Sequence, residues 1–344
     1  MRWDGQRTDT DEPALLGLPG LVRSVRTPEF AGVVFHEVRA KSVLNRVDGA
    51  ARLPFGWTVN PYRGCAHGCT YCFARGAHRY LDLDTGRDFD SQIVVKVNAA
   101  EVLGRELRRP KWTHEHVAMG TNTDPYQRAE GRYALMPGVI DELTRSGTPF
   151  SILTKGTVLA RDLPQLAGSG ERVRVGVGVS IALLDRELQR VPEPGTASPQ
   201  ARLELVRKVR EAGLPCGVMV APVLPALTDS TAQLDDLLGA VAAAGATGVV
   251  VLALHLRPGA REWFAAWLTE HRPDLVPLYR GLYARGSYVD PRYRAMLRER
   301  VRPLLRRHGL TARDGGADDG WPRGSLPGDA GADTPVDTGQ LTLL

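Results

Sequence analysis

Residues 57–75 read WTVNPYRGCAHGCTYCFAR, and this segment sets the expectations for the rest of the chain. It places Cys65, Cys69 and Cys72 at C-x3-C-x2-C spacing on a turn rich in glycine. Three thiolates on so short a loop can converge on one soft metal centre. A closed structural zinc site takes four ligands, and a [4Fe–4S] cluster normally takes four cysteines, one for each iron. Three cysteines would leave one iron open to an outside ligand, so the spacing predicts a reactive iron–sulfur cluster.

Two other interpretations of these cysteines compete with a cluster. The first is a zinc ion with His67 or His78 as the fourth ligand, although His67 sits inside the loop and is poorly placed to join its neighbours. The second is a disulfide framework, but four cysteines in 344 residues, three of them crowded together, do not have that pattern. The spacing favours the cluster over both.

The segment resembles the cluster loop of the radical S-adenosylmethionine (radical SAM) superfamily, including the aromatic Tyr71 just before the third cysteine. The longer string NPYRGCAHGCTYCFAR is similar to a narrower branch, the DNA-repair-photolyase-like proteins related to spore photoproduct lyase. The resemblance implies that the amino and carboxylate groups of S-adenosylmethionine chelate the open iron. It also implies that an electron, supplied from outside by a donor such as flavodoxin or ferredoxin, splits this cofactor to a 5′-deoxyadenosyl radical that takes a hydrogen atom from the substrate.

The composition is that of a soluble globular protein, with 43% hydrophobic and 24% charged residues. The first residues, MRWDGQRTDTDEP, carry charges where a signal peptide needs an apolar run, and no stretch is long and apolar enough to span a membrane. We therefore expect a cytoplasmic protein, where thiols stay reduced. The net charge is +5, and residues 313–344 hold six aspartates against two arginines. The rest of the chain therefore carries about +9, which favours a polyanionic partner such as nucleic acid.

Short β-rich runs alternate with helical stretches from about residue 57 to residue 255. Several runs are nearly continuous in Val, Ile and Leu, which suits strands buried on both faces of a parallel sheet. Six β-then-α units predict a parallel α/β fold. The resemblance implies a partial (β/α)6 barrel with its active site at the carboxyl ends of the strands. The six runs are residues 57–62, 116–122, 149–155, 173–180, 216–224 and 247–254.

The helical stretches between these runs carry start and stop signals. In NAAEVLGRELRR (98–109), Asn98 can cap the helix, with a glutamate three residues further on. In SPQARLELVRKVREAG (198–213), Ser198 is the expected N-cap, Pro199 lies in the first turn and Gly213 ends the helix.

The chain is expected to divide into four parts. Residues 1–50 form an N-terminal extension that packs on the core, in which residues 30–47 are expected to be a strand and a short turn of helix. Residues 51–258 form the barrel. Residues 259–310 form a basic helical segment, in which Pro303 is expected to kink or restart the last helix. Residues 311–344 have almost nothing to bury, which predicts a disordered acidic tail.

Two features outside the barrel suggest partners. Residues 279–309 hold nine arginines interleaved with tyrosines, a pattern that suits either nucleic-acid contact or a packed helix with a solvated basic face. The chain ends in QLTLL, which resembles the peptide that docks on the bacterial sliding clamp. An apolar anchor on a flexible tether suits recognition of a peptide in a groove. The predicted clamp-binding residues are Gln340, Leu341, Leu343 and Leu344.

Polar side chains follow the second predicted strand at the expected active-site rim. Thr121, Asn122, Thr123 and Asp124 stand where the family's motif for the amino group of S-adenosylmethionine falls, although the glycine–glycine–glutamate form of that motif is absent. Asp124 is the expected partner of the ammonium group. The alternative is an Asx-type turn ahead of Pro125.

Five more residues are expected to bind the cofactor, the first of which is Tyr71 in the cysteine loop. Lys155 ends the third strand and Ser180 the fourth. Glu193 and Arg202 resemble the Glu…Arg pair of the photolyase-like branch. For Arg202, a cofactor carboxylate and a salt bridge to Glu193 are equally open as partners. His255, after the sixth strand, is expected to be structural.

The fourth cysteine, Cys216, opens the fifth strand and is expected to be a buried small hydrophobe away from the active site. Spore photoproduct lyase returns its hydrogen atom through a cysteine near the second strand, but this chain has no cysteine between Cys72 and Cys216. If a donor is needed, a tyrosine such as Tyr126 would have to serve. The expected function is a radical SAM enzyme acting on nucleic acid. The alternatives are the same chemistry on a peptide or small metabolite, and a zinc-stabilised binding module without catalysis.

Overall fold

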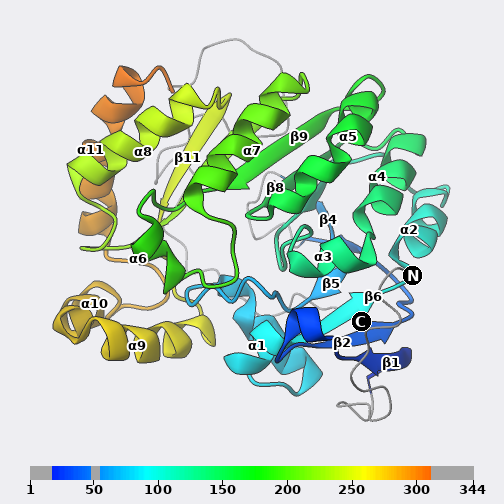
Figure 1. The fold of residues 1–344 in the computed structure, drawn as a ribbon, viewed down its shortest axis with the longest axis horizontal. Coiled ribbons are helices and arrows are strands. Elements are labelled where there is room, and N and C mark those ends of the chain that lie inside the picture. Colours follow the sequence, from blue (N-terminus) through cyan, green and yellow to red (C-terminus); the bar gives the residue numbers. More distant parts are fainter. Residues whose placement is uncertain (1–17, 48–54, 311–344) are drawn as a thin grey trace.

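The computed structural model describes residues 18–47 and 55–310. Its main element is a seven-stranded sheet with the order β11-β10-β9-β8-β7-β4-β3 (Figure 1). All neighbouring strands pair in parallel except β3, which is antiparallel to β4. Each of the six predicted β-rich runs contains a strand of this sheet, which confirms the parallel α/β fold. The strands are β3 Leu44–Arg46, β4 Trp57–Val59, β7 Val117–Met119, β8 Phe150–Thr154, β9 Val175–Ser180, β10 Cys216–Val223 and β11 Gly248–Ala253.

The curved sheet is open, because no pairing between β3 and β11 exists within residues 18–47 and 55–310. Helices cover its outer face and bury the apolar side of each strand in one continuous core (Figure 1). This is the partial barrel that the family resemblance implies. The covering helices are α2 Ala99–Leu107, α4 Met136–Arg145, α5 Leu163–Gly170, α7 Pro199–Glu211 and α8 Thr231–Ala243. Helix α3 Arg128–Tyr133 packs in the core of a second, smaller sheet, and the short helix α6 Arg186–Arg190 buries only Gln189.

A second, four-stranded sheet lies against the first strands of the barrel, with the order β1-β2-β6-β5. Strands β1 Leu21–Val25 and β2 Val34–Val38 come from the N-terminal segment. They are joined by β6 Gln92–Lys96 and by the short β5 Tyr62–Arg63, which leads directly into the cysteine loop. The small sheet therefore fixes the start of that loop.

Two local predictions in this region are wrong. Residues 30–47 contain two strands, β2 and β3, and no helical turn after β2, because β3 pairs with β4 and the buried Glu106 carboxylate accepts the amides of Val43 and Leu44. Asn98 stands at the start of α2 without capping it, since its side chain instead hydrogen-bonds the backbone N–H and C=O of Ala40. In both cases a contact distant in sequence outweighs the local signal.

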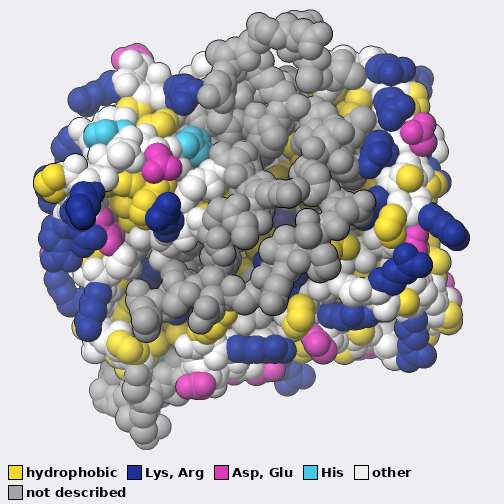
Figure 2. Space-filling model, turned by 180° about the vertical axis from the view of Figure 1, so that it is seen from behind, with side chains coloured by type: hydrophobic (Ala, Val, Ile, Leu, Met, Phe, Trp, Pro, Cys, Tyr) yellow, Lys and Arg dark blue, Asp and Glu magenta, His cyan; other side chains and the backbone are white. Residues whose placement is uncertain are grey.

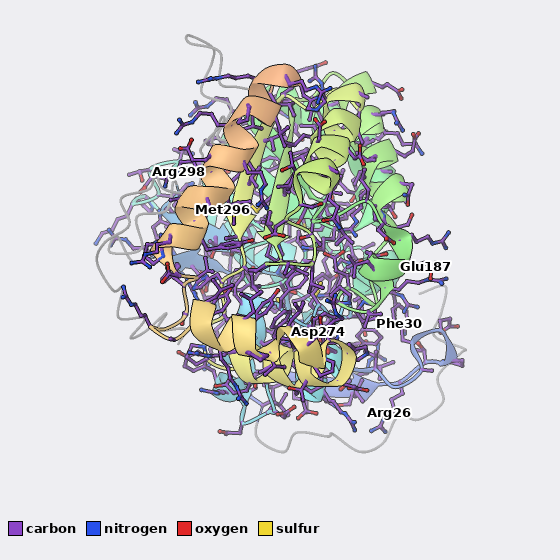
Figure 3. The ribbon with its side chains drawn as sticks, turned by 90° about the vertical axis from the view of Figure 1, so that its left-hand side faces the viewer. Arg26, Phe30, Glu187, Asp274, Met296 and Arg298 are labelled. Atoms are coloured by element: carbon purple, nitrogen blue, oxygen red, sulfur yellow. The ribbon has the colours of Figure 1, made fainter. Side chains whose placement is uncertain are left out.

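The C-terminal segment forms three helices, α9 Ala260–His271, α10 Val276–Leu282 and α11 Pro291–Arg307. Helix α11 packs on α8 and continues through Pro303 without a restart (Figures 1 and 3). Two of its arginines bind α8 or the loop before it: Arg300 lies 3.8 Å from Asp229, and Arg307 lies 2.6 Å from Asp235. Part of the basic character of this segment is therefore structural.

Candidate active site

The three cysteines lie on a loop that follows β4 and β5 at the carboxyl edge of the sheet. Cys65 and Cys69 are buried, Cys72 is half-buried, and none of the three is in a disulfide. The loop turns tightly through backbone hydrogen bonds from Gly68 to Cys65 and from Cys72 to Cys69, each 3.2 Å long. Gly64, just before the first cysteine, has φ +77°, which other residues rarely adopt. The glycine-rich composition of the segment is therefore needed for its path.

Two polar side chains from the β7–α3 connection hold the first half of the loop. The fully buried Gln127 accepts the amide N–H of Ala66 at 2.9 Å and donates to the carbonyl of Gly64 at 3.1 Å. Thr123 donates its hydroxyl to the same carbonyl at 2.7 Å. Thr123, predicted to contact the cofactor, is thus engaged with the backbone beside Cys65.

A second support comes from residues 192–196, which lie against the middle of the loop. The amide of Thr70 donates to the carbonyl of Pro192, and the amide of Gly195 donates to the carbonyl of His67, both at 2.9 Å. A Cβ at position 195 would lie 2.1 Å from the carbonyl oxygen of Ala66. Only glycine allows the two backbones to approach this closely.

Arg75 anchors the end of the loop. Its side chain is fully buried and lies between the rings of Phe89 and Trp263, with the guanidinium carbon 5.1 and 5.2 Å from the two ring centres. It donates to the carbonyl of Cys69 at 3.0 Å and to both carboxylate oxygens of Asp90 at 2.8 Å. A planar guanidinium makes this set of contacts where a lysine could not.

Asp124 is the hub of the rim after β7. One carboxylate oxygen accepts the amide of Tyr126 and the hydroxyl of Thr154, and the other accepts the amide of Lys155 and lies 3.3 Å from His67 Nδ1. Burial by itself would raise the pKa of Asp124, but the nearby imidazole and these hydrogen bonds hold it below its usual value. Asp124 was predicted to bind the ammonium group of the cofactor. Its contacts instead join the cysteine loop to the end of β8.

A second carboxylate, Glu193, connects the predicted cofactor residues on the other side of the loop. It accepts the hydroxyl of Tyr71 and pairs with Arg202 at 2.5 Å, with both charged side chains fully buried. Arg202 also donates to the carbonyl of Ser180 at 2.9 Å, and the Ser180 hydroxyl lies 2.9 Å from Lys155 Nζ. Burial by itself would raise the pKa of Glu193, but the neighbouring cations and the Tyr71 hydroxyl lower it to about 2.

These contacts bring Tyr71, Lys155, Ser180, Glu193 and Arg202 into one network beside the cysteines. Of the two partners left open for Arg202, the salt bridge to Glu193 is present. Ser198 caps α7 as expected, accepting the amide of Ala201. The cap and Pro199 start the helix where Arg202 faces inward from the first turn.

The donor set fits an iron–sulfur cluster better than a single metal ion. Among the described residues, no three His, Cys, Asp or Glu side chains converge closely enough to hold one ion, whereas a cluster takes each cysteine on a different iron. His67 is engaged with Asp124 and His78 Nε2 with the carbonyl of Gln92, so neither is held toward the thiols. Three buried polar atoms at this site, Thr70 Oγ1, Thr121 Oγ1 and Arg202 Nε, lack any hydrogen-bond partner within the described chain.

The remaining predicted residues lie apart from this network. Asn122 uses its backbone amide to reach Asn60 at 3.4 Å. Cys216 is fully buried at the amino end of β10, where the sequence placed it. The hydroxyl of Tyr126 is buried and donates to Asp162 at 3.0 Å, so it is already committed to a carboxylate. His255 stacks on Tyr288 with a centre distance of 4.3 Å.

Four supporting residues were missed at the level of sequence, namely Arg75, Asp90, Gln127 and Gly195. Arg75 ends the quoted cysteine segment, three residues after Cys72, and Gln127 lies three residues after Asp124. Nothing local distinguishes them from surface residues. Gly195 is part of a Pro-Gly turn, where glycine is common for other reasons.

The fold and the cysteine loop together define a radical SAM enzyme. Residues 59–238 match the family profile of the Radical SAM superfamily, and the chain belongs to this superfamily. Membership implies S-adenosylmethionine and an iron–sulfur cluster as cofactors. The family that the cysteine loop resembles is thereby confirmed. Among the described residues, no helix combines the length and apolar character needed to cross a membrane.

More particular relatives are found by sequence and by structure. The chain is 60% identical over 317 residues to the uncharacterized protein Rv2578c of Mycobacterium tuberculosis, covering 90% of this chain and 93% of that protein. It is 24% identical over 195 residues to the uncharacterized protein MJ0683 of Methanocaldococcus jannaschii, covering 56% and 69%. A mutant spore photoproduct lyase with bound AdoMet and dinucleoside spore photoproduct superposes with a TM-score of 0.59 at 16% identity, covering 79% of this chain and 78% of that one. The lyase and this chain share a fold.

Proposed function

We propose that Cys65, Cys69 and Cys72 hold a [4Fe–4S] cluster, that the enzyme cleaves S-adenosylmethionine reductively, and that its substrate is nucleic acid. When bound, the two cofactors supply a 5′-deoxyadenosyl radical that takes a hydrogen atom from the substrate. The observation that carries the proposal is the set of three free thiols on a loop whose backbone is held at every turn, with no histidine or carboxylate of the described chain held toward them as a fourth ligand.

The chain's own residues bind and orient the cofactors. Among the unpartnered buried donors at the site, we assign Thr121 Oγ1 and Arg202 Nε to polar groups of S-adenosylmethionine. Lys155 is held by Ser180 and lies 5.9 Å from the centre of the Tyr71 ring. It provides a positive charge for the carboxylate of S-adenosylmethionine. Glu193 keeps Tyr71 in place between the second and third cysteines.

Two observations support a nucleic-acid substrate. The solved structures that share this fold include spore photoproduct lyase complexed with dinucleoside spore photoproduct. Lys and Arg side chains also line both edges of the face shown in Figure 2, where Asp and Glu are fewer. Lesion repair and nucleic-acid modification both fit this chemistry. An external one-electron donor such as flavodoxin or ferredoxin, available in the cytoplasm, completes it. The predicted clamp-binding peptide and acidic tail, residues 311–344, lie outside the described residues.

The alternatives differ in how the site would behave. With a peptide or small-metabolite substrate, the cofactor chemistry would be the same, and only the molecule that donates the hydrogen atom would differ. A zinc-stabilised module would need a fourth ligand near the cysteines, and no single-ion ligand group exists among the described residues.

Anaerobic reconstitution with iron and sulfide tests the cofactor proposal. The wild-type protein should become brown with about four irons per chain and form 5′-deoxyadenosine under strong reductant. The Cys69→Ala variant should do neither, while Cys216→Ala, which removes a thiol from the opposite end of β10, should behave as wild type. A colourless wild-type protein that holds one zinc would refute the proposal.

Hydrogen transfer tests the substrate. The reconstituted enzyme is incubated with ultraviolet-damaged DNA, tRNA or a peptide digest. In one series the substrate carries deuterium, and in the other the solvent is D2O. We expect deuterium to pass from one of the two nucleic acids to 5′-deoxyadenosine. Transfer from the peptide digest alone would refute the nucleic-acid assignment and leave the cofactor chemistry standing.

A further inference from the structure

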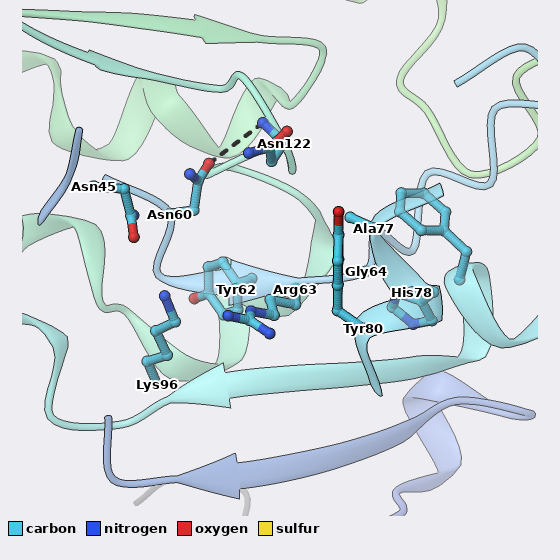
Figure 4. Close-up of a pocket in the computed structure, with 11 residues that line it drawn as sticks. Asn45, Asn60, Tyr62, Arg63, Gly64, Ala77, His78, Tyr80, Lys96 and Asn122 are labelled. Atoms are coloured by element: carbon cyan, nitrogen blue, oxygen red, sulfur yellow. Dashed lines mark hydrogen bonds between the residues drawn. The ribbon is translucent and has the colours of Figure 1, made fainter. Parts of the chain in front are cut away.

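A cavity of about 60 Å³ opens where the small sheet meets the first strands of the barrel (Figure 4). A buried water needs roughly 10–15 Å³ of cavity volume, so this cavity has room for several waters or one small oxyanion. Its walls come from β3, β5, β6, the segment after Cys72 and the end of β7. The polar residues that line it are Asn45, Asn60, Tyr62, Arg63, His78, Tyr80, Lys96 and Asn122; the Tyr62 hydroxyl is already bound to Glu130, and His78 Nε2 lies against the carbonyl of Gln92.

The cavity holds two cations and no carboxylate among its lining residues. Lys96 is only 7% exposed, and Arg63 is half-buried beside it. Neither side chain makes a hydrogen bond or ion pair with another described residue. Burying a charge without a partner costs free energy, and burial together with the nearby Arg63 lowers the pKa of Lys96 to about 8.

The nearest carboxylate is already engaged elsewhere. Glu106 interacts electrostatically with Lys96, but its oxygens accept the hydroxyl of Ser42 and the amides of Val43 and Leu44. It therefore stabilises the turn into β3. The positive charge of the cavity remains available to an anion that enters from solvent.

Neutral hydrogen-bond donors complete the lining. The side-chain amides of Asn60 and Asn122 lie on one wall, facing Lys96 across the cavity (Figure 4). Tyr80 is 66% exposed and forms the rim. Two cations with planar amides and a phenol around a small volume match the acceptor oxygens of a phosphate group.

We infer that this cavity is a phosphate subsite, in which Lys96 and Arg63 bind a phosphodiester of the nucleic-acid substrate beside the reacting nucleotide. Its location argues for this role: Arg63 and Gly64 lead directly into Cys65, and Asn122 follows Thr121 on the active-site rim. The volume admits a single phosphate. The identity of the anion as a nucleic-acid phosphate rests on the proposed function, whereas the anion site itself does not.

The test uses the full chain and needs no turnover. Thermal unfolding is measured with inorganic phosphate against potassium chloride of equal ionic strength, for wild type, Lys96→Met and Arg63→Gln. Lys111→Met, which removes an exposed lysine from the turn after α2, is the matched control. We expect phosphate to raise the Tm of wild type and of the control beyond the effect of chloride, and both cavity variants to lose this shift. Without phosphate, Lys96→Met should have a higher Tm than wild type, because it removes an unpaired buried charge.

Binding of a single-stranded oligodeoxynucleotide, followed across a salt series, identifies the source of the phosphate. Loss of one phosphate contact should weaken binding of Lys96→Met and reduce the slope of log K against log salt by about 1. Equal phosphate shifts in wild type and both cavity variants would overturn the anion site. A lost phosphate shift with unchanged oligonucleotide binding would overturn the nucleic-acid assignment of the subsite. Absence of any oligonucleotide binding by wild type would instead refute the proposed function, and the phosphate arm would still decide the anion site.

Discussion

Replacing Gly195 by alanine should displace the cysteine loop without touching any cysteine. The added Cβ would lie 2.1 Å from the carbonyl oxygen of Ala66 and 2.9 Å from the Cα of His67, both backbone atoms that cannot rotate away. Ordinary contact begins at 3.4 Å, so the two segments must separate by roughly 1 Å or more, a strain that typically costs about 1–3 kcal/mol. The displaced residues stand between Cys65 and Cys69.

The consequence should be larger for function than for stability. A misplacement of about 1 Å at a reacting centre can reduce the rate on the order of 100-fold, whereas the loss of about 1–3 kcal/mol lowers Tm by only several degrees in a chain of this size. The measurements are iron content after anaerobic reconstitution, formation of 5′-deoxyadenosine, and Tm of the protein before reconstitution.

Gly168→Ala is the matched control. Gly168 lies in α5 with nothing within 4 Å of its added Cβ. Alanine there should be neutral or stabilise the helix by about 0.5–1 kcal/mol, with normal iron binding. If Gly195→Ala also binds iron and turns over like wild type, the conclusion that residues 192–196 set the position of the loop is wrong.

Three further predictions follow from charge and burial. Arg202→Ala should destabilise the protein by about 3–5 kcal/mol, because Glu193 is left buried and unpaired. In urea unfolding, the double variant Arg202→Met/Glu193→Gln should recover most of that loss. Equal losses in the single and double variants would show that the Arg202–Glu193 ion pair does not set the stability of this site. Because the folded pKa of Lys96 is about 8 and its unfolded value is 10.5, the unfolded chain binds more protons between these values. Stability should therefore rise with pH across this range by up to about 3 kcal/mol relative to Lys96→Met, and a flat difference would refute the unpaired charge. Arg75→Lys should clearly reduce the iron content after reconstitution and change Tm only slightly. Equal iron content in wild type and Arg75→Lys would refute the role of Arg75 as the loop anchor.

Six of the seven strands of the barrel could be predicted from sequence because each lies in a short, largely buried run rich in β-forming residues. Val175–Ser180 and Gly248–Ala253 show this pattern clearly. The small sheet could not be predicted, because it pairs Val34–Val38 with Gln92–Lys96 across more than fifty residues and contains only one short strand near the cysteines. Pairing over such a distance has no periodic signal within one segment.

The spacing of the cysteines was sufficient to single out Cys65, Cys69 and Cys72 as candidate metal ligands. It did not reveal the residues that hold the cysteine loop in place. Position at strand ends predicted that Lys155 and Ser180 would lie at one edge of the parallel sheet, whereas the family resemblance predicted that Glu193 and Arg202 would belong to the site. It could not predict whether Arg202 would bind Glu193 or a cofactor, since both partners suit a guanidinium. It also could not single out Arg75 or Gln127, whose importance comes from contacts with distant backbone groups and, for Arg75, with Asp90.

The charges around the loop determine how easily its buried thiols lose their protons. Burial raises the pKa of Cys69 and of Cys72, so the unliganded thiols are neutral and binding of iron must displace their protons. The nearby cations oppose this effect: Lys155 and Arg202 act on Cys69, and Arg75 acts on Cys72. The carboxylates that pair with these arginines, Glu193 and Asp90, act in the opposite direction, and Asp124 raises the pKa of Cys65 further. Cys69 and Cys72 are therefore the thiols that neighbouring cations help to deprotonate when iron binds in the proposed site.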